Sequence, residues 1–169
     1  MASLARFVAG DVQTADLGYE AYDAALMECV LSILSAKRHS LSRIADALKP
    51  GARLAVTDVT VEGAIPDAYM GVLSIAGCVG DARPWAEYEE LLWSVGLELV
   101  RSENLPEAAT ATVTDVQGKL MLAEIAVGLG KLPLDPALIA RGKELIGGVQ
   151  TLIAEGTLSY CMLVAEKPS

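Results

Sequence analysis

The sequence is poor in the residues that build metal centres, disulfide frameworks and nucleic-acid surfaces. Its 169 residues include three cysteines, Cys29, Cys78 and Cys161, and a single histidine, His39. The cysteines are odd in number and widely spaced, which excludes a disulfide framework and the CxxC spacing of a zinc site. Thirteen Lys and Arg against 22 Asp and Glu leave a net charge of −9. This excludes the clustered positive charge that nucleic-acid backbones require, so neither a metal nor a nucleic-acid partner is expected.

Long apolar runs are also missing. No segment holds the roughly 18 unbroken apolar residues of a membrane span, and the amino terminus lacks the apolar core of a signal peptide. These absences predict a cytoplasmic protein without a membrane partner. Hydrophobic residues nevertheless make up 53% of the chain, and the mean hydropathy is +0.41. Because a monomer rarely exposes so much apolar surface, we predict a homo-oligomer, most simply a homodimer.

Short apolar runs alternate with helical patterns along the whole chain. Strands are expected at 5–10, 22–29, 53–61, 97–105 and 158–167, and helices at 37–48, 84–95, 107–129 and 135–156, with a weaker helical stretch before Cys78. Asp135 with Pro136 is a typical helix start, and Gly96 a typical helix end. The alternation predicts an α/β domain with about five mostly parallel strands and helices on both faces.

Ligands of such sheets bind at the carboxyl ends of the strands. On that rule the candidate site residues are Asp11, Glu28, Cys29 and Asp58, together with the loops that follow them. Each has a simpler structural interpretation beside the functional one. The acidic residues suit turns and helix caps, and a cysteine at a strand end is commonly a small buried hydrophobe.

Three segments, in this order, resemble the class I S-adenosylmethionine-dependent methyltransferases. AGDVQTADLGYEAYDAALMECVLSIL is similar to the GD motif of that family followed by its FD strand, and LKPGARLAVTDV to its LKPGG signature, strand and Asp. The strands at 97–105 and 158–167 resemble the closing pair of the family's sheet. The resemblance covers nearly the whole chain and implies a Rossmann-like fold. It also implies that the helical pair at about 107–156 is a lid over the active site or, as we favour, a subunit interface.

The resemblance implies S-adenosylmethionine as the cofactor, with Asp11 on the adenine amine. In the family, the first strand carries a glycine-rich turn for the methionine moiety, and the second ends in an acidic residue that takes the ribose hydroxyls. Neither GxGxG nor GxGxxG occurs in this sequence. Residues 1–169 are therefore expected to form one truncated methyltransferase-like domain that begins at the family's third strand, with an incomplete cofactor site.

A narrower resemblance involves two cysteines. ECVLSIL and AGCVGDARPWAEYEELLWSVGLE are similar to two segments of the arsenite methyltransferases. By that similarity Cys29 and Cys78 correspond to cysteines that bind trivalent arsenic, and soft thiolates do suit soft ions. The family's further upstream cysteine has no counterpart here. The expected substrate-binding residues are Glu28, Cys29, Asp58 and Cys78.

Other polar residues have mainly structural interpretations. His39 is expected to be a solvated residue near a helix start rather than a general base. Asp81, Arg83 and Trp85 suit either a substrate lid or a helix cap with an aromatic anchor. Three functions thus remain open: a small-molecule methyltransferase, a non-catalytic oligomeric domain that binds a small ligand or a protein, and a thiol sensor of metals or oxidants.

Overall fold

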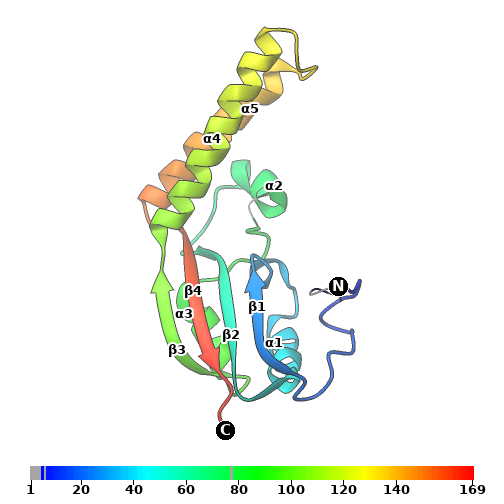
Figure 1. Cartoon of the computed structure of the whole chain (residues 1–169). Helices are drawn as coiled ribbons and strands as arrows, with labels where there is room; N and C mark the ends of the chain where they lie inside the picture. Colours follow the sequence, from blue (N-terminus) through cyan, green and yellow to red (C-terminus); the bar gives the residue numbers. More distant parts are fainter. Residues whose placement is uncertain (1–4, 6, 77) are drawn as a thin grey trace.

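The computed structural model describes residues 5, 7–76 and 78–169 (Figure 1). The elements, in chain order, are β1 (Tyr22–Glu28), η1 (Leu31–Ile33), α1 (Lys37–Ala47), β2 (Leu48–Val61), α2 (Asp67–Ala76), α3 (Trp85–Trp93), β3 (Glu98–Asn104), α4 (Pro106–Gly128), α5 (Pro136–Ala154) and β4 (Leu158–Glu166). None of these described helices is long and apolar enough to cross a membrane.

The strands form one mixed sheet in the order β1-β2-β4-β3. β1 runs parallel to β2, whereas β4 is antiparallel to both of its neighbours. The predicted α/β class with a helical pair before the last strand is confirmed. The prediction of mostly parallel strands is also confirmed, because β1, β2 and β3 run in the same direction, and of the four described strands only β4 runs opposite to them.

The strand predicted at 5–10 is not formed. Ala5 and the residues at 7–10 belong to no helix or strand, and Arg6 lies outside the described residues. Phe7 and Val8 are 95% and 71% exposed, so these two apolar side chains are not buried as those of a strand in the sheet would be. Within the described chain, β1 is therefore the edge strand, and the sheet has four strands.

The main core lies between the sheet and two helices. Alternate residues of β2 and β4, such as Leu54, Val56 and Leu163, are fully buried and pack against α1 and α3. Both helices lie behind the sheet in Figure 1. The opposite face carries no described helix along most of its length, although helices were expected on both faces. There Leu26 of β1 is 71% exposed.

Local sequence signals set several boundaries. The helix expected at 37–48 ends at Ala47, and β2 begins at once at Leu48. Pro50 and Gly51 lie inside β2, where the register with β1 shifts between Tyr22 and Ala24. A bulge accommodates the proline and the positive φ of 77° at Gly51.

Helices α4 and α5 form a long antiparallel hairpin that projects from the end of β3 and the start of β4, at the same edge of the sheet where β1 and β2 end (Figure 1). Asp135 caps α5, as predicted, by accepting a hydrogen bond from the amide of Ala137 at 2.9 Å. A second apolar cluster at the base of the hairpin joins α5 to α2 and includes Leu73, Val149 and Leu158. Tyr69 of α2 packs directly on Gly148, where a Cβ atom would lie only 2.4 Å from the ring. Glycine at 148 therefore allows this close approach.

Candidate functional site

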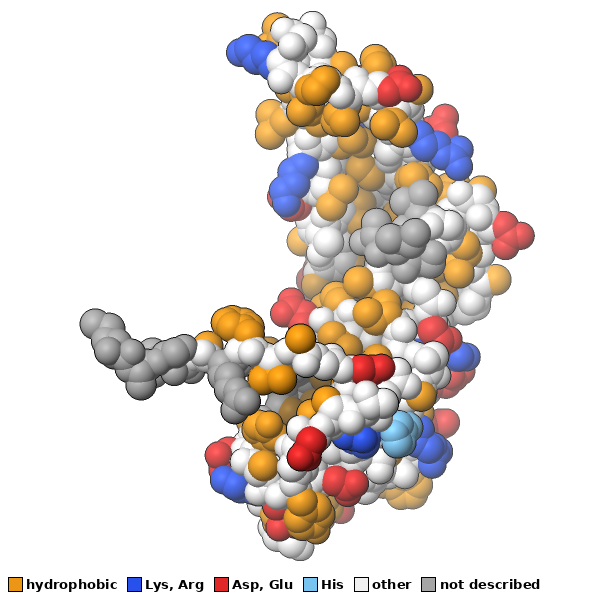
Figure 2. Space-filling view, turned by 90° about the vertical axis from the view of Figure 1, so that its right-hand side faces the viewer, with side chains coloured by type: hydrophobic (Ala, Val, Ile, Leu, Met, Phe, Trp, Pro, Cys, Tyr) orange, Lys and Arg blue, Asp and Glu red, His pale blue; other side chains and the backbone are white. Residues whose placement is uncertain are grey.

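A cavity of about 540 Å³ lies where the hairpin meets the carboxyl ends of the strands. Figure 2 shows the molecule hollowed between the projecting hairpin and the body that carries the sheet. The lining is mostly apolar and comes from six helices and strands and from two loops. Its residues are Glu28, Cys29, Val59, Leu73, Cys78, Val79, Ala109, Thr112, Val113, Val116, Leu120, Gly142, Leu145, Ile146, Val149, Leu158, Ser159 and Tyr160.

Cys29 and Cys78 line this same cavity although 49 positions separate them in the sequence. Both have a positive φ, 51° and 55°, and Glu20 is the only other described non-glycine residue with one. Residues other than glycine rarely adopt this left-handed backbone conformation, and strained backbone positions of this kind are common at functional sites. The amide of Cys29 continues the β1–β2 ladder by donating to the carbonyl of Thr57 at 2.9 Å. The chain turns sharply there, at the carboxyl end of β1.

The thiol of Cys29 is paired with a phenol from β4. Its Sγ lies 3.3 Å from Oη of Tyr160, at hydrogen-bonding distance. Burial raises the pKa of Cys29, and it also raises that of Tyr160, where the bond to Cys29 adds to the effect. Both groups are therefore protonated near neutral pH. The arrangement offers a ligand two neutral hydrogen-bonding groups on an apolar wall.

Glu28 is the only charged residue among those that line the cavity. It is the last residue of β1 and is exposed. No lysine, arginine or histidine is part of the described lining, so a phosphate or carboxylate inside the cavity has no cation to pair with. Burying an unpaired anion is costly, which makes neutral or cationic molecules the better occupants.

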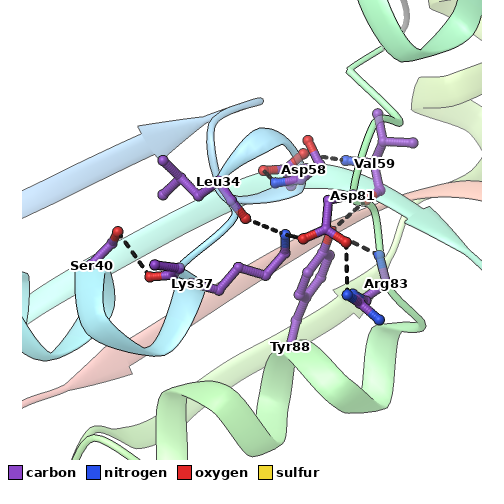
Figure 3. A network of polar contacts seen from close by, with 10 residues as sticks. Leu34, Lys37, Ser40, Asp58, Val59, Asp81, Arg83 and Tyr88 are labelled. Carbon is purple, nitrogen blue, oxygen red and sulfur yellow. Dashed lines mark hydrogen bonds and ion pairs between the residues drawn. The ribbon is translucent and has the colours of Figure 1, made fainter. Parts of the chain in front are cut away.

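Asp58, also predicted as a site residue, does not line the cavity. Its side chain is fully buried on the core face of β2. One carboxylate oxygen accepts from the amide of Ser32 at 3.0 Å and the other from the amide of Val59 at 2.8 Å (Figure 3). This carboxylate ties the turn after β1 to β2, so it positions the loop that begins at Cys29.

A second polar network fixes the loop on the other side of the cavity. Lys37, whose side chain is only 6% exposed, donates from Nζ to Asp81 at 2.7 Å and to the carbonyl of Leu34 at 2.7 Å. Asp81 also binds Arg83, and the amide of Arg83 donates to the hydroxyl of Tyr88 (Figure 3). The loop that follows Cys78 is thereby held against α1 and α3. Asp81 and Arg83 act as structural anchors rather than as a lid.

Trp85 and His39 also have structural contacts. The indole of Trp85 donates to Ser102 Oγ at 2.9 Å, which supports its interpretation as an aromatic anchor. Nε2 of His39, on α1, lies 3.2 Å from the carbonyl oxygen of Gln13. Neither residue lines the cavity.

The contribution of β4 was not predicted from the sequence, whereas a lid over the active site was one of the two alternatives considered for the hairpin helices. Tyr160 and Ser159 meet Cys29 only because β4 pairs with β2, where Thr57 is opposite Met162 and Val59 is opposite Tyr160. The run LSYCMLVAEK predicts a strand at 158–167, but a strand pattern does not show which strand will lie beside it.

Solved structures with the same fold include several enzymes. The chain superposes on a protein from Galdieria sulphuraria assigned as a sarcosine dimethylglycine methyltransferase with a TM-score of 0.74, at 17% identity over 94% of this chain and 58% of the other. For phosphoethanolamine N-methyltransferase 2 of Haemonchus contortus, bound to S-adenosyl-L-methionine, the TM-score is 0.72 at 17% identity, over 94% of this chain and 36% of the other. The chain has the fold of the S-adenosylmethionine-dependent methyltransferases. No protein-family model matches its sequence.

The methyltransferase fold also serves other chemistry. The [4+2]-cyclase SpnF has a TM-score of 0.65 at 21% identity, over 96% of this chain and 55% of the other. The chain thus spans between about a third and three fifths of the length of these structures. Since fold does not imply function, the activity has to be argued from the site.

Asp11, the expected adenine contact, is exposed, and its carboxylate accepts from the amide of Gln13 at 2.8 Å within its own turn. Arg43 of α1 binds this turn through the carbonyls of Gln13 and Ala15. The glycines between 128 and 130 end α4 and do not follow a strand.

Proposed function

We propose that this chain binds a small, mostly apolar molecule in the cavity between the α4–α5 hairpin and the carboxyl edge of the sheet. It is the substrate-binding part of a methyltransferase-like protein, and its own residues leave the cofactor site incomplete. The observation that carries the proposal is the cavity of about 540 Å³, which has an apolar lining and a few convergent polar groups. Ligand sites commonly have this size and composition.

The polar groups of the cavity predict its selectivity. Tyr160, with its raised pKa, donates or accepts a hydrogen bond as a neutral phenol beside the neutral thiol of Cys29. Glu28 supplies negative charge at the edge of β1. We therefore propose a neutral or cationic ligand with one hydrogen-bonding group, such as an amine or alcohol on an apolar skeleton. A diphosphate is disfavoured, because the described lining offers it no cation.

Methyl transfer depends on S-adenosylmethionine, which would supply an electrophilic methyl group when bound. The residues of this chain contribute to such a reaction only by binding and orienting the acceptor. Cys78, Glu28 and Cys29 are proposed as substrate contacts, since all three line the cavity. For Asp58 we propose an indirect role, since its carboxylate holds the turn that follows Cys29. We place the protein in the cytoplasm, in keeping with its free cysteines.

Dye binding tests the cavity directly. We expect the neutral naphthalene dye prodan to bind with enhanced fluorescence, and the related anion anilinonaphthalene sulfonate to bind at least tenfold more weakly. Gly142→Phe should abolish prodan binding, because residue 142 faces the cavity and a Cβ there already meets Leu120 at 3.0 Å. The measurement is a fluorescence titration of each dye.

The matched control is Gly147→Phe, five residues further along α5. Gly147 is exposed, and a Cβ there meets nothing within 4 Å. Both variants replace a helical glycine, so both should raise helix propensity, and circular dichroism verifies that both fold. Equal prodan affinity in the two variants would refute the cavity as the binding site. Calorimetric titration with S-adenosylmethionine should show no saturable heat, and a stoichiometric isotherm would contradict the incomplete cofactor site.

A thiol sensor is the second candidate function, and one observation favours it. Cys29 and Cys78 line one cavity and both have strained backbones. Against it, the raised pKa of Cys29 reduces the thiolate fraction on which thiol reactivity depends. We expect iodoacetamide at pH 7.5 to modify Cys29 at least tenfold more slowly in the folded chain than in urea, as measured by peptide mass spectrometry. Rapid formation of a Cys29–Cys78 disulfide with diamide would instead support the sensor.

A further inference from the structure

The outer face of α4 is apolar, although the helix is almost entirely exposed. Ala109 is the only buried residue of this fully described helix of 23 residues. Met121, Leu122, Ile125 and Leu129 are 56%, 68%, 54% and 64% exposed. A helix that is apolar on all sides normally lies inside a protein. This face therefore has the composition of a contact surface.

The exposed residues form one continuous stripe. Gly118, Leu122, Ile125 and Leu129 follow one another at intervals of four, three and four residues, the spacing of a coiled-coil seam. The cavity uses the opposite side of the helix, since Leu120 lines it and Leu122 lies about 200° further around the axis. We call the residues 118, 121, 122, 125 and 129 the outer stripe. One side of α4 thus lines the cavity, and the other is unpartnered within the described chain.

We propose that the outer stripe binds the same stripe of a second copy, with the two α4 helices antiparallel about a two-fold axis. In this arrangement the two-fold axis passes the centre of the stripe, at roughly residue 123 to 124. The numbers of two residues that face each other across the axis therefore add up to about 247. Leu122 then meets Ile125, and Gly118 makes room for Leu129. A two-fold axis perpendicular to the helices produces this antiparallel order, in which the same surface of both copies makes the contact.

The charges at the two ends of the stripe favour the same order. Asp115 precedes the stripe and Lys131 follows it, and both are exposed. Antiparallel pairing brings Asp115 of each copy to Lys131 of the other, whereas parallel pairing brings like charges together. Lys119 already forms an ion pair with Asp115 at 2.6 Å and Lys143 with Glu124 at 2.6 Å, both within the copy.

The available area suits a reversible dimer. The four large side chains of the stripe expose on the order of 400 Å² of apolar surface, at about 100 Å² each. Because interfaces are about 60% apolar, this corresponds to roughly 700 Å² buried per copy, near the typical value of about 800 Å². A membrane is the other apolar occupant to consider, but the net charge of −9 repels anionic lipid headgroups.

Sedimentation velocity over micromolar to submillimolar concentrations tests the proposal. The 17.7 kDa chain should shift from monomer to dimer as its concentration rises. Leu122→Glu should weaken the dimer at least tenfold, because it buries two like charges beside the two-fold axis. The control Leu26→Glu changes an equally exposed leucine on the edge strand β1 and should leave the dimer intact. Circular dichroism verifies that both variants fold.

Charge reversal tests the antiparallel order. Asp115→Lys and Lys131→Asp should each weaken the dimer severalfold at low salt, and the double variant should restore it. A chain that stays monomeric at every concentration overturns the proposal. A dimer that is unaffected by Leu122→Glu also overturns it. A dimer that Leu26→Glu disrupts would place the contact on the edge strand of the sheet instead. Flotation of the chain with anionic vesicles, lost in Leu122→Glu and without dimerisation, would assign the stripe to a membrane.

Discussion

Asp81→Ala should destabilise the protein by about 3 kcal/mol, because it leaves the ammonium group of a buried lysine without its counter-ion. Lys37 is only 6% exposed and has Asp81 and the carbonyl of Leu34 as its partners. For a chain of this size, that loss lowers the Tm by roughly 6–12 °C. Thermal unfolding followed by circular dichroism measures it. Because the network anchors the loop after Cys78, prodan affinity should fall as well.

Lys37→Met is the matched control for this prediction. It removes the buried charge itself, and the Asp81 that remains is 34% exposed and still paired with Arg83 at 2.7 Å. We expect a cost of about 1 kcal/mol or less, since replacing a buried ion by an apolar group of similar size is often nearly neutral. Adding Lys37→Met to Asp81→Ala should recover much of the lost stability. Equal costs for the two single variants would contradict the account.

The same pair predicts how stability depends on acid pH. Burial opposes ionisation of Asp81, but the hydrogen bond and charge of Lys37, together with Arg83, hold the pKa of its carboxyl below the ordinary 3.8. A carboxyl with a lowered pKa in the folded state stabilises the fold above its ordinary pKa. That contribution is lost as the pH falls through the folded-state pKa. The difference between wild type and Asp81→Ala should accordingly shrink below about pH 4.

Alkaline pH should destabilise the fold strongly between about pH 9 and 12. Burial, followed by the charge of Asp58, raises the pKa of Cys161 from 9.0 to about 12. Burial also raises the pKa of Tyr88 and Tyr160 above the ordinary 10.0. In this window the unfolded chain loses these protons while the folded chain keeps them, so the free energy of unfolding falls as pH rises. Each group contributes about 1.4 kcal/mol per pH unit.

Urea unfolding followed by circular dichroism at pH 8 to 11 measures this effect. Cys161→Ala is the control, because it removes one of the three groups from the main core at little change in volume. Other titrations, such as those of lysine, are common to both proteins and cancel in the comparison. The variant should lose stability less steeply than wild type, by about 1.4 kcal/mol per pH unit above pH 9. Parallel curves would show that Cys161 is not held protonated by the fold.

The elements with strong local signals were predicted well. The hairpin helices were expected at 107–129 and 135–156 and lie at Pro106–Gly128 and Pro136–Ala154. Their caps are local, since Asp135 contacts a residue only two positions away. The strand expected at 22–29 is β1, within one residue. Periodicity and capping act over a few residues, so the sequence alone is enough to reveal them.

The prediction of a strand at 5–10 was wrong, because strand formation depends on a partner strand that is distant in the sequence. An apolar run becomes a strand only when another strand pairs with it, and β1 remains the edge of the described sheet. The same applies to the face of the sheet that has no described helix over most of its length. A sequence pattern indicates that a surface is apolar, but it does not supply the partner that covers it.

The residues of the candidate site also fall into those that local sequence patterns predict and those that only tertiary contacts bring together. The sequence by itself determined the α/β class, the helical pair and the placement of Glu28 and Cys29 at a strand end, because each depends on near neighbours in the chain. Only the tertiary structure decided that Cys78 and Tyr160 share a cavity with Cys29, and that Asp58 is a buried anchor for the turn at Ser32. Those outcomes depend on the pairing of β4 with β2 and on the ion pair between Lys37 and Asp81. Such contacts join residues far apart in sequence, and no local pattern encodes them.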